Sequence, residues 1–104
     1  MERYKVSLSR LAEQDVNEII RYISVDLAVP DTAMVMLETI EESLKSLSTM
    51  PEIHPLVQDD VLASAGYRKL IIKNYIAFYL VDNMKKEVDV IRVLYSRRDW
   101  HRLI

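Results

Sequence analysis

The spacing of the apolar residues changes once along the chain, and this change constrains the fold more than any other feature. Between Leu11 and Leu47, apolar side chains recur every three or four residues, the period of a helix with one buried face. From Tyr67 to Tyr95 they alternate with polar residues or form short continuous runs, which is typical of strands. Helices followed by strands predict an α+β domain, with the helices packed on one face of a sheet.

The first half of the chain is expected to hold one strand and two helices. Residues 4–8 alternate as a short strand, and Ser9 follows in an N-cap position. An amphipathic helix then extends to about Leu27, with these residues mostly on its solvent side: Glu13, Asp15, Asn17, Glu18 and Arg21. Pro30 separates it from a second helix that ends near Leu47, because proline is tolerated only in the first turn. So short a connection predicts an antiparallel helical hairpin.

Three strands are expected in the second half, over residues 67–73, 75–81 and 88–95, after an irregular link that ends near Ala65. The middle strand is nearly all apolar, which predicts a central strand buried on both faces. Residues 97–104 form a short tail with one or two helical turns. The order β-α-α-β-β-β therefore predicts a largely antiparallel four-stranded sheet. The hairpin would cover one face, and the other face would be less covered and carry basic side chains.

Length and composition predict a single cytoplasmic domain over residues 1–104. A chain of this size buries one core. The absence of cysteine excludes disulfides and thiolate metal sites, which suits a reducing compartment. The sequence contains neither an apolar signal-peptide core nor a run of about 18 apolar residues, so we expect no membrane span.

The charges are divided unevenly between the two halves of the chain. Residues 66–104 hold nine Lys/Arg against four acids, a net charge of +5, whereas residues 1–65 hold five bases against twelve acids, a net charge of −7. The near-neutral total of −2 therefore hides a basic C-terminal half. Such an asymmetry indicates an anionic partner, although it does not determine the fold.

Common catalytic and cofactor motifs are absent. The chain has no cysteine nucleophile, no glycine-rich phosphate loop and no nucleophile elbow. His54 and His101 lack metal-ligand spacing, so both are interpreted first as solvent-facing, and the acidic pair Asp59-Asp60 as a solvated loop. Three methionines are interpreted as core or gap-filling residues: Met34, Met36 and Met50. We therefore expect no cofactor and no bound metal.

The basic residues of the second half carry the strongest functional signal. Arg68, Lys69 and Lys73 lie on one predicted strand, and a second group follows the last strand: Tyr95, Arg97, Arg98, Trp100 and His101. Arginine binds phosphate bidentately and aromatic rings stack on bases, so a patch of this kind would suit RNA. It would also allow metal-free RNA cleavage, with cations stabilising the transition state. A structural alternative stays open, because edge cations prevent aggregation and the tail could dock through Trp100, Leu103 and Ile104.

The whole chain resembles the RelE/ParE superfamily of type II toxin–antitoxin toxins. The resemblance rests on five segments in this order and spacing: Leu8-Ser9 with the helix start at 12–19, the exit of the second helix at 44–51, Gly66-Tyr67-Arg68-Lys69-Leu70, the aromatic strand 75–79, and Val90–Trp100. The long helical hairpin is more similar to the ParE-like branch. The resemblance implies a growth-inhibiting, plasmid-stabilising toxin that an acidic antitoxin, encoded alongside, wraps and neutralises.

The resemblance implies two alternative activities. ParE-like members poison DNA gyrase and are not nucleases, whereas RelE-like members cut mRNA on the ribosome with basic sheet residues and a C-terminal Tyr or His. Ile76 stands where ribosome-dependent members place a catalytic Arg, which with the low net charge favours the gyrase inhibitor. The nuclease alternative stays open. Its catalytic residues, implied by matching positions, would be Arg98, Arg68 or Lys69, and His101, and only then would the chain be an enzyme.

An antitoxin surface is expected on the less covered sheet face. Apolar side chains beside the basic residues would suit an acidic amphipathic segment that folds on binding: Ile71, Tyr79 and Leu94. The predicted binding residues are Lys73, Tyr79, Tyr95, Arg97 and Trp100. These predictions depend on Arg68, Lys69, Lys73 and Arg98 converging into one patch in the folded chain.

Overall fold

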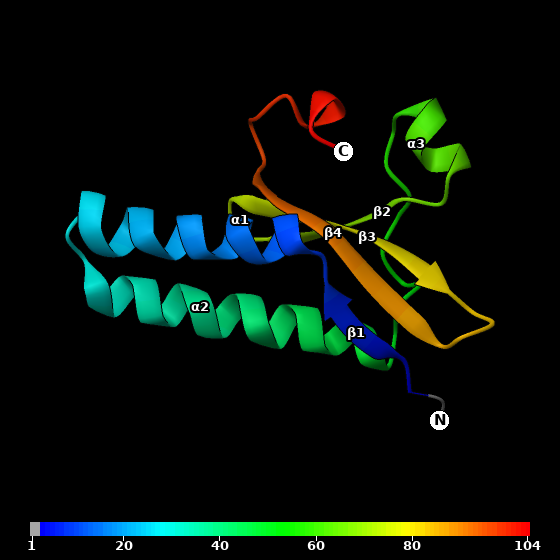
Figure 1. Cartoon of the computed structure of the whole chain (residues 1–104), viewed down its shortest axis with the longest axis horizontal. Coiled ribbons are helices and arrows are strands. Elements are labelled where there is room, and N and C mark those ends of the chain that lie inside the picture. Colours follow the sequence, from blue (N-terminus) through cyan, green and yellow to red (C-terminus); the bar gives the residue numbers. More distant parts are fainter. Residues whose placement is uncertain (1–2) are drawn as a thin grey trace.

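The computed structural model describes residues 3–104 and has the predicted α+β architecture (Figure 1). The elements follow one another as β1 (Lys5–Leu8), α1 (Arg10–Arg21), a π-helical turn (Tyr22–Asp26), α2 (Pro30–Lys45), a 3-10 turn (Ser46–Ser48), α3 (Asp60–Ser64), β2 (Arg68–Ile72), β3 (Tyr75–Asp82), β4 (Glu87–Tyr95) and a 3-10 turn (Trp100–Arg102). The predicted order is therefore confirmed, and α3 is an addition to it. No helix within residues 3–104 is long and apolar enough to cross a membrane.

The sheet has the strand order β1-β4-β3-β2. β1 runs parallel to β4, and the other two pairs are antiparallel, so the prediction of a largely antiparallel sheet is confirmed. β1 pairs only from Lys5↔Glu87 to Leu8↔Val90, although β4 continues to Tyr95. The second half of β4 would therefore have an open edge if β1 were its only neighbour on that side.

Helix α1 completes this open edge of β4. The Ser9 backbone N–H donates to the Val90 carbonyl at 2.8 Å, and the Ser9 hydroxyl donates to the Ile91 carbonyl at 2.6 Å. The same hydroxyl accepts from the Ala12 N–H, which confirms the predicted N-cap. One turn later, the Asp15 carboxylate accepts from the Val93 N–H at 3.0 Å.

The prediction that Asp15 lies on the solvent side of its helix was wrong. Its side chain is only 7% exposed and forms a bidentate ion pair with Arg92, with N···O distances of 2.7 and 2.8 Å. A buried carboxylate is stable only when it is paired and hydrogen-bonded, and here a guanidinium and a strand N–H supply those partners. The exception to helical amphipathicity is therefore the residue that bonds α1 to β4.

The α1–α2 hairpin covers one face of the sheet, which we call the hairpin face. Its core joins apolar side chains of both helices to the strands, including Ala12, Ala33, Ile40 and Tyr79. Pro30 occupies the first turn of α2 as predicted, after Ala28 turns the chain with a φ of 55°. Met36 packs against this core, but Met34 and Met50 are more than half exposed, so their interpretation as core residues was wrong.

The opposite face, which we call the tail face, is not the sparsely covered surface that was predicted. It carries a second apolar cluster of Val57, Ile76, Phe78 and Leu94. The link before β2, with α3, and the C-terminal tail pack over this cluster (Figure 1). The alternative in which the tail docks through Trp100, Leu103 and Ile104 is thereby confirmed. The central strand β3 is buried on both sides, as its composition predicts.

Candidate functional site

The structure does not join the predicted basic residues into one patch. Arg68 and Lys69 lie at the start of β2, whereas Lys73 lies in the turn after its end. Lys73 is five positions after Arg68, which corresponds to about 16 Å along an extended strand. The Asn74 carbonyl accepts from the Ser96 N–H at 2.8 Å, so the β2–β3 turn lies beside the segment that leads to Arg97 and Arg98. The cations are therefore split between the two ends of β2.

Arg68 is held by the link that precedes β2. It donates to the His54 carbonyl at 2.8 Å and pairs with Glu52 at 3.5 Å. By strand alternation Lys69 points to the opposite face, where its neighbour across the strand pair is Phe78. Arg68 and Lys69, which were predicted to converge in one patch, are thus on different faces of the sheet. His54, predicted to be solvent-facing, is partly covered, and burial lowers its pKa.

Tyr79 and Leu94 are buried, so they offer no surface to the antitoxin in this structure. The Tyr79 hydroxyl donates to the Pro51 carbonyl at 2.7 Å. Burial raises the pKa of Tyr79 to about 12, because the ionised phenolate is poorly solvated there. Ile71 remains exposed, and it is the only member of the predicted apolar trio that does.

The aromatic tail residues pack on the tail face. The Trp100 ring lies over Phe78 with 4.9 Å between ring centroids, and His101 stacks on Trp100 at 3.9 Å. The His101 ring lies with Nδ1 3.0 Å from the Asp59 carboxylate, which also accepts from the Leu62 N–H and so caps α3. The hydrogen bond from the Leu62 N–H, and after it the neighbouring His101 ring, lower the pKa of Asp59. Asp59 is therefore a helix cap with a partner, and the prediction that it is simply a solvated loop residue was wrong.

Arg98 and Tyr95 line a cleft between the hairpin and the end of β4, together with residues for which the sequence analysis proposed no role. We call it the tyrosine cleft; its volume is about 790 Å³, and its key lining residues are Tyr22, Leu27, Val29, Tyr75, Tyr95 and Arg98. Tyr75 and Tyr95 meet edge to face with ring centroids 6.0 Å apart. Burial, and then the neighbouring tyrosines, raise the pKa of Tyr75.

The sequence analysis missed Tyr22, because its place in the cleft depends on residues of β3 and β4 that lie far from it in the sequence. It follows Asp15 and Ile19 on one line of α1, at steps of four and three residues, so helical spacing alone places these three side chains together. Nothing in that spacing shows that Tyr75 and Tyr95 approach the same line. The cleft is a property of the packed hairpin and sheet.

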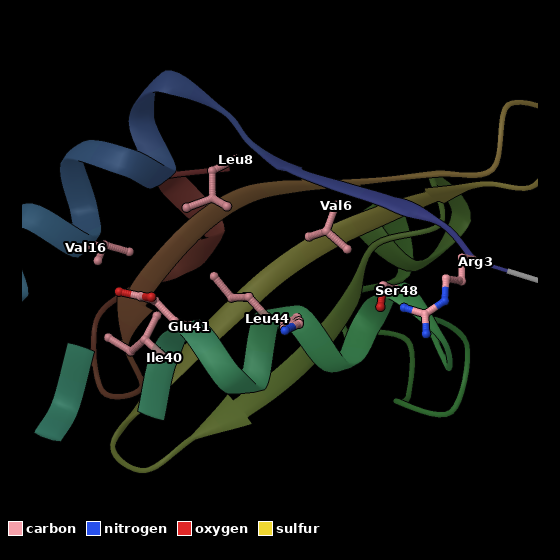
Figure 2. Close-up of a pocket in the computed structure, with 9 residues that line it drawn as sticks. Arg3, Val6, Leu8, Val16, Ile40, Glu41, Leu44 and Ser48 are labelled. Atoms are coloured by element: carbon pink, nitrogen blue, oxygen red, sulfur yellow. The ribbon is translucent and has the colours of Figure 1, made fainter. Parts of the chain in front are cut away.

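A second hollow lies where β1 faces α2. We call it the edge groove; its volume is about 480 Å³, and it is lined by Arg3, Val6, Leu8, Val16, Ile40, Glu41, Leu44, Lys45 and Ser48. Figure 2 shows Val6 and Leu8 of β1 and Leu44 of α2 extending into the same space, with Arg3 and Ser48 at one end. β1 ends the sheet on this side, so its outer edge pairs with no other strand of residues 3–104. No group of three metal-binding side chains occurs within the same residues.

Comparison with solved structures identifies the fold. The chain resembles one from the chromosomal ParDE toxin–antitoxin system of P. aeruginosa, with a TM-score of 0.74, 22% identity, and coverage of 91% of this chain and 98% of that one. It also resembles a chain of the RelBE2 toxin–antitoxin complex of Mycobacterium tuberculosis (TM-score 0.62, 17% identity, 89% and 98% covered). For the E. coli toxin RelE in its free state, the TM-score is 0.63, with 16% identity and 91% and 85% covered. These are folds of the RelE/ParE superfamily.

The sequence itself matches a family model within that superfamily. Residues 6–100 match the ParE toxin of the type II toxin–antitoxin system parDE. The match spans nearly the whole chain, and the protein therefore belongs to the ParE toxin family. A search of curated proteins finds no match.

Proposed function

We propose that this protein is the toxin of a type II toxin–antitoxin module that arrests growth by binding DNA gyrase and that an antitoxin neutralises. The observation that carries the choice of target is the filled tail face. Ile76, Phe78 and Leu94 form an apolar cluster beneath the docked tail, on the sheet surface where an RNA-cutting member would need exposed basic side chains. Gyrase is cytoplasmic, so the proposal places the toxin there.

The geometry of the predicted catalytic residues also disfavours the nuclease alternative. Metal-free cleavage needs a proton-transferring group and cations within hydrogen-bond reach of the same phosphate. Here Arg68 is engaged with Glu52 and His101 with Asp59, while Arg98 lines a cleft near the β2–β3 turn, at the other end of β2 from Arg68. These groups do not surround a common space. The likeness to the ParDE structure also supports the gyrase inhibitor over the nuclease, because its TM-score is higher than those of the RelBE2 and RelE structures.

The edge groove is the proposed binding surface for the antitoxin. Its floor is apolar, its rim carries Arg3 and Lys45 against Glu41, and the neighbouring edge of β1 is unpaired within residues 3–104. An apolar groove with a net cationic rim suits an acidic amphipathic segment that orders on binding, and an open strand edge suits backbone pairing. This surface replaces the predicted one, because two of the apolar residues proposed for it, Tyr79 and Leu94, are buried.

Parallel assays with the purified toxin test the choice between the two targets. With gyrase and plasmid DNA we expect loss of supercoiling and protein-trapped DNA breaks; with ribosomes translating a defined mRNA we expect the message to stay intact. Heat-denatured toxin serves as the control in both assays. Codon-linked mRNA cleavage with normal gyrase activity would instead support the nuclease.

A further inference from the structure

We propose that the tyrosine cleft is the surface that binds the toxin's protein target, and that its occupant is an apolar segment of that target bearing a carboxylate that pairs with Arg98. The inference rests on the proposed function, because it assumes a toxin that acts by binding. It goes further by assigning target binding to the space between the hairpin end and the end of β4, separate from the edge groove. No residue lines both the cleft and the groove.

The lining of the cleft has the composition of an energetically important protein interface. Tyrosine and arginine are enriched among the residues that dominate binding energy, and they act best around a pocket that takes an apolar anchor. Here three tyrosines and one arginine surround such a pocket, and Leu27 and Val29 extend it. The side chains of Tyr22, Leu27, Val29 and Tyr95 are 40–52% exposed, so this apolar surface is open to solvent.

The polar groups of the cleft are available to a partner. Within residues 3–104 the Arg98 side chain makes no ion pair or hydrogen bond, in contrast to Arg92, which is bound by Asp15 and the Leu103 carbonyl. The hydroxyls of Tyr22, Tyr75 and Tyr95 likewise have no hydrogen-bond partner there. An exposed guanidinium that lines an apolar pocket is matched best by a carboxylate, which it can bind with two parallel hydrogen bonds.

The charge around the cleft favours a protein segment over nucleic acid. A nucleic-acid surface presents a row of cations, because neutralised phosphates supply most of the affinity. The cleft lining contains one cation without an ion pair, Arg98, and an acid, Glu18; Asp15 is already neutralised by Arg92. Inside the cleft, phosphates would therefore meet a single unpaired cation, whereas an apolar segment with one or two charges fits.

The backbone at the end of α1 explains how the cleft is built. The helix widens into a π-helical turn at Tyr22–Asp26, a feature that occurs often at functional sites. Ile23 turns into the core and is buried, while Tyr22 beside it lines the cleft and stays half exposed. The hairpin thus carries its aromatic side chain to the end of the sheet, where Tyr75 and Tyr95 lie.

Four variants of the full chain test this inference. Arg98→Ala, Tyr22→Ala and Leu27→Asp each alter the cleft lining, and Met84→Ala is the matched control, because Met84 is 94% exposed in the β3–β4 turn and lines neither hollow. We expect each cleft variant to reduce growth arrest and gyrase inhibition by at least about tenfold in dose. Their melting temperatures should stay within a few degrees of the wild type, and Met84→Ala should match the wild type in every assay.

Several outcomes would overturn the inference. The first is that the cleft variants keep full potency. The second is that they weaken antitoxin binding by the same factor as they reduce potency. The third is that the toxin forms a dimer and that the same variants dissociate it. A loss of target affinity of a hundredfold or more between about 50 and 200 mM salt would also overturn it, because that dependence indicates a nucleic-acid interface. Leu27→Asp keeps the test decisive if a tyrosine variant fails to fold, since Leu27 lies in the exposed connection.

The inference and the proposed function can fail separately. If the wild type arrests growth without affecting gyrase, and the cleft variants lose that arrest, the gyrase assignment is wrong and the cleft remains the target surface. If the wild type inhibits gyrase and the cleft variants inhibit it equally well, the proposed function stands and the cleft is excluded.

Discussion

Phe78 and Tyr79 are neighbours on β3 and both are fully buried, yet the two faces of the sheet cover them in different ways. Tyr79 lies on the hairpin face, beneath two long helices with apolar stripes of helical period. Phe78 lies on the tail face, beneath a five-residue helix, an irregular link and the last residues of the chain. Regular elements therefore close one core, and short segments close the other.

Polar bonds compensate for the short elements on the tail face. Arg92 donates to the Leu103 carbonyl at 2.9 Å, His101 lies against Asp59, and Arg68 holds the link through the His54 carbonyl. Few contacts must break for such a cover to open, so local opening there needs less free energy than opening of the hairpin. We therefore expect the cover of the tail face, and not the helical hairpin, to be the less stable region of this fold.

Asp15→Ala is expected to have the largest effect on stability, because Asp15 supports both faces. The change leaves the Arg92 guanidinium without its counter-charge and the Val93 N–H without an acceptor, and it loosens the residue that holds Leu103. Loss of one partner of a buried ion pair costs about 3–5 kcal/mol. Chemical denaturation measures this as a lower midpoint with an unchanged slope.

Two companion variants sharpen the test of Asp15. Glu13→Ala removes a nearby exposed acid of the same helix and should change the free energy of unfolding by less than about 1 kcal/mol. Asp15→Ala combined with Arg92→Met removes both charges, and it should recover part of the loss because no unpaired charge stays buried. A double variant less stable than Asp15→Ala alone would contradict this account.

The hairpin face could be predicted from the sequence, whereas the cover of the tail face was predicted only as an alternative, for a physical reason. Helical and strand periods are local, so the order of elements, the Ser9 cap and the Pro30 helix start follow from neighbours in the chain. The Asp15–Arg92 pair joins residues 77 apart, and only the packed structure shows it. Helix α3 was missed because five residues are too short for a periodic pattern.

The candidate site was predicted in part. Tyr95 and Arg98 do line one cleft, as their grouping by chemistry predicted. Arg68 and Lys69 were grouped with them because they share a charge and match a basic position of the family, and they do not line this cleft. Adjacent residues of a strand point to opposite faces, and the two ends of a strand lie far apart. Charge counts therefore indicated which half of the chain carries cations but not which of them meet in space.

Trp100→Ala tests the tail face and is expected to have an intermediate effect. The ring packs on Phe78 and supports His101, and its removal leaves the apolar cluster partly open. We expect a loss of about 2 kcal/mol, below the range for a fully buried aromatic residue because Trp100 is partly exposed. Hydrogen exchange should show faster exchange in residues 57–65 and 97–104, with little change in α1 and α2. Equal acceleration in the helices would mean that the two faces open together.

Tyr79→Phe is expected to have the smallest effect, and it tests whether the two faces are joined through the link. The Tyr79 ring lies on the hairpin face, but its hydroxyl donates to the Pro51 carbonyl of the segment that continues over the tail face. Removing one hydrogen bond while the ring stays in place costs about 1 kcal/mol.

The pKa of Tyr79, raised to about 12 from its usual value of 10.0, adds a pH dependence to this test, because the folded state favours the protonated phenol. This contribution is fully present below pH 10 and is lost as the pH rises towards 12. Denaturation series between pH 8 and 12 should therefore show the wild type losing stability more steeply than Tyr79→Phe above pH 10. Parallel curves would mean that the Tyr79 hydroxyl is not buried, and a Tyr79→Phe variant as stable as the wild type near neutral pH would mean that its bond to Pro51 does not join the two faces.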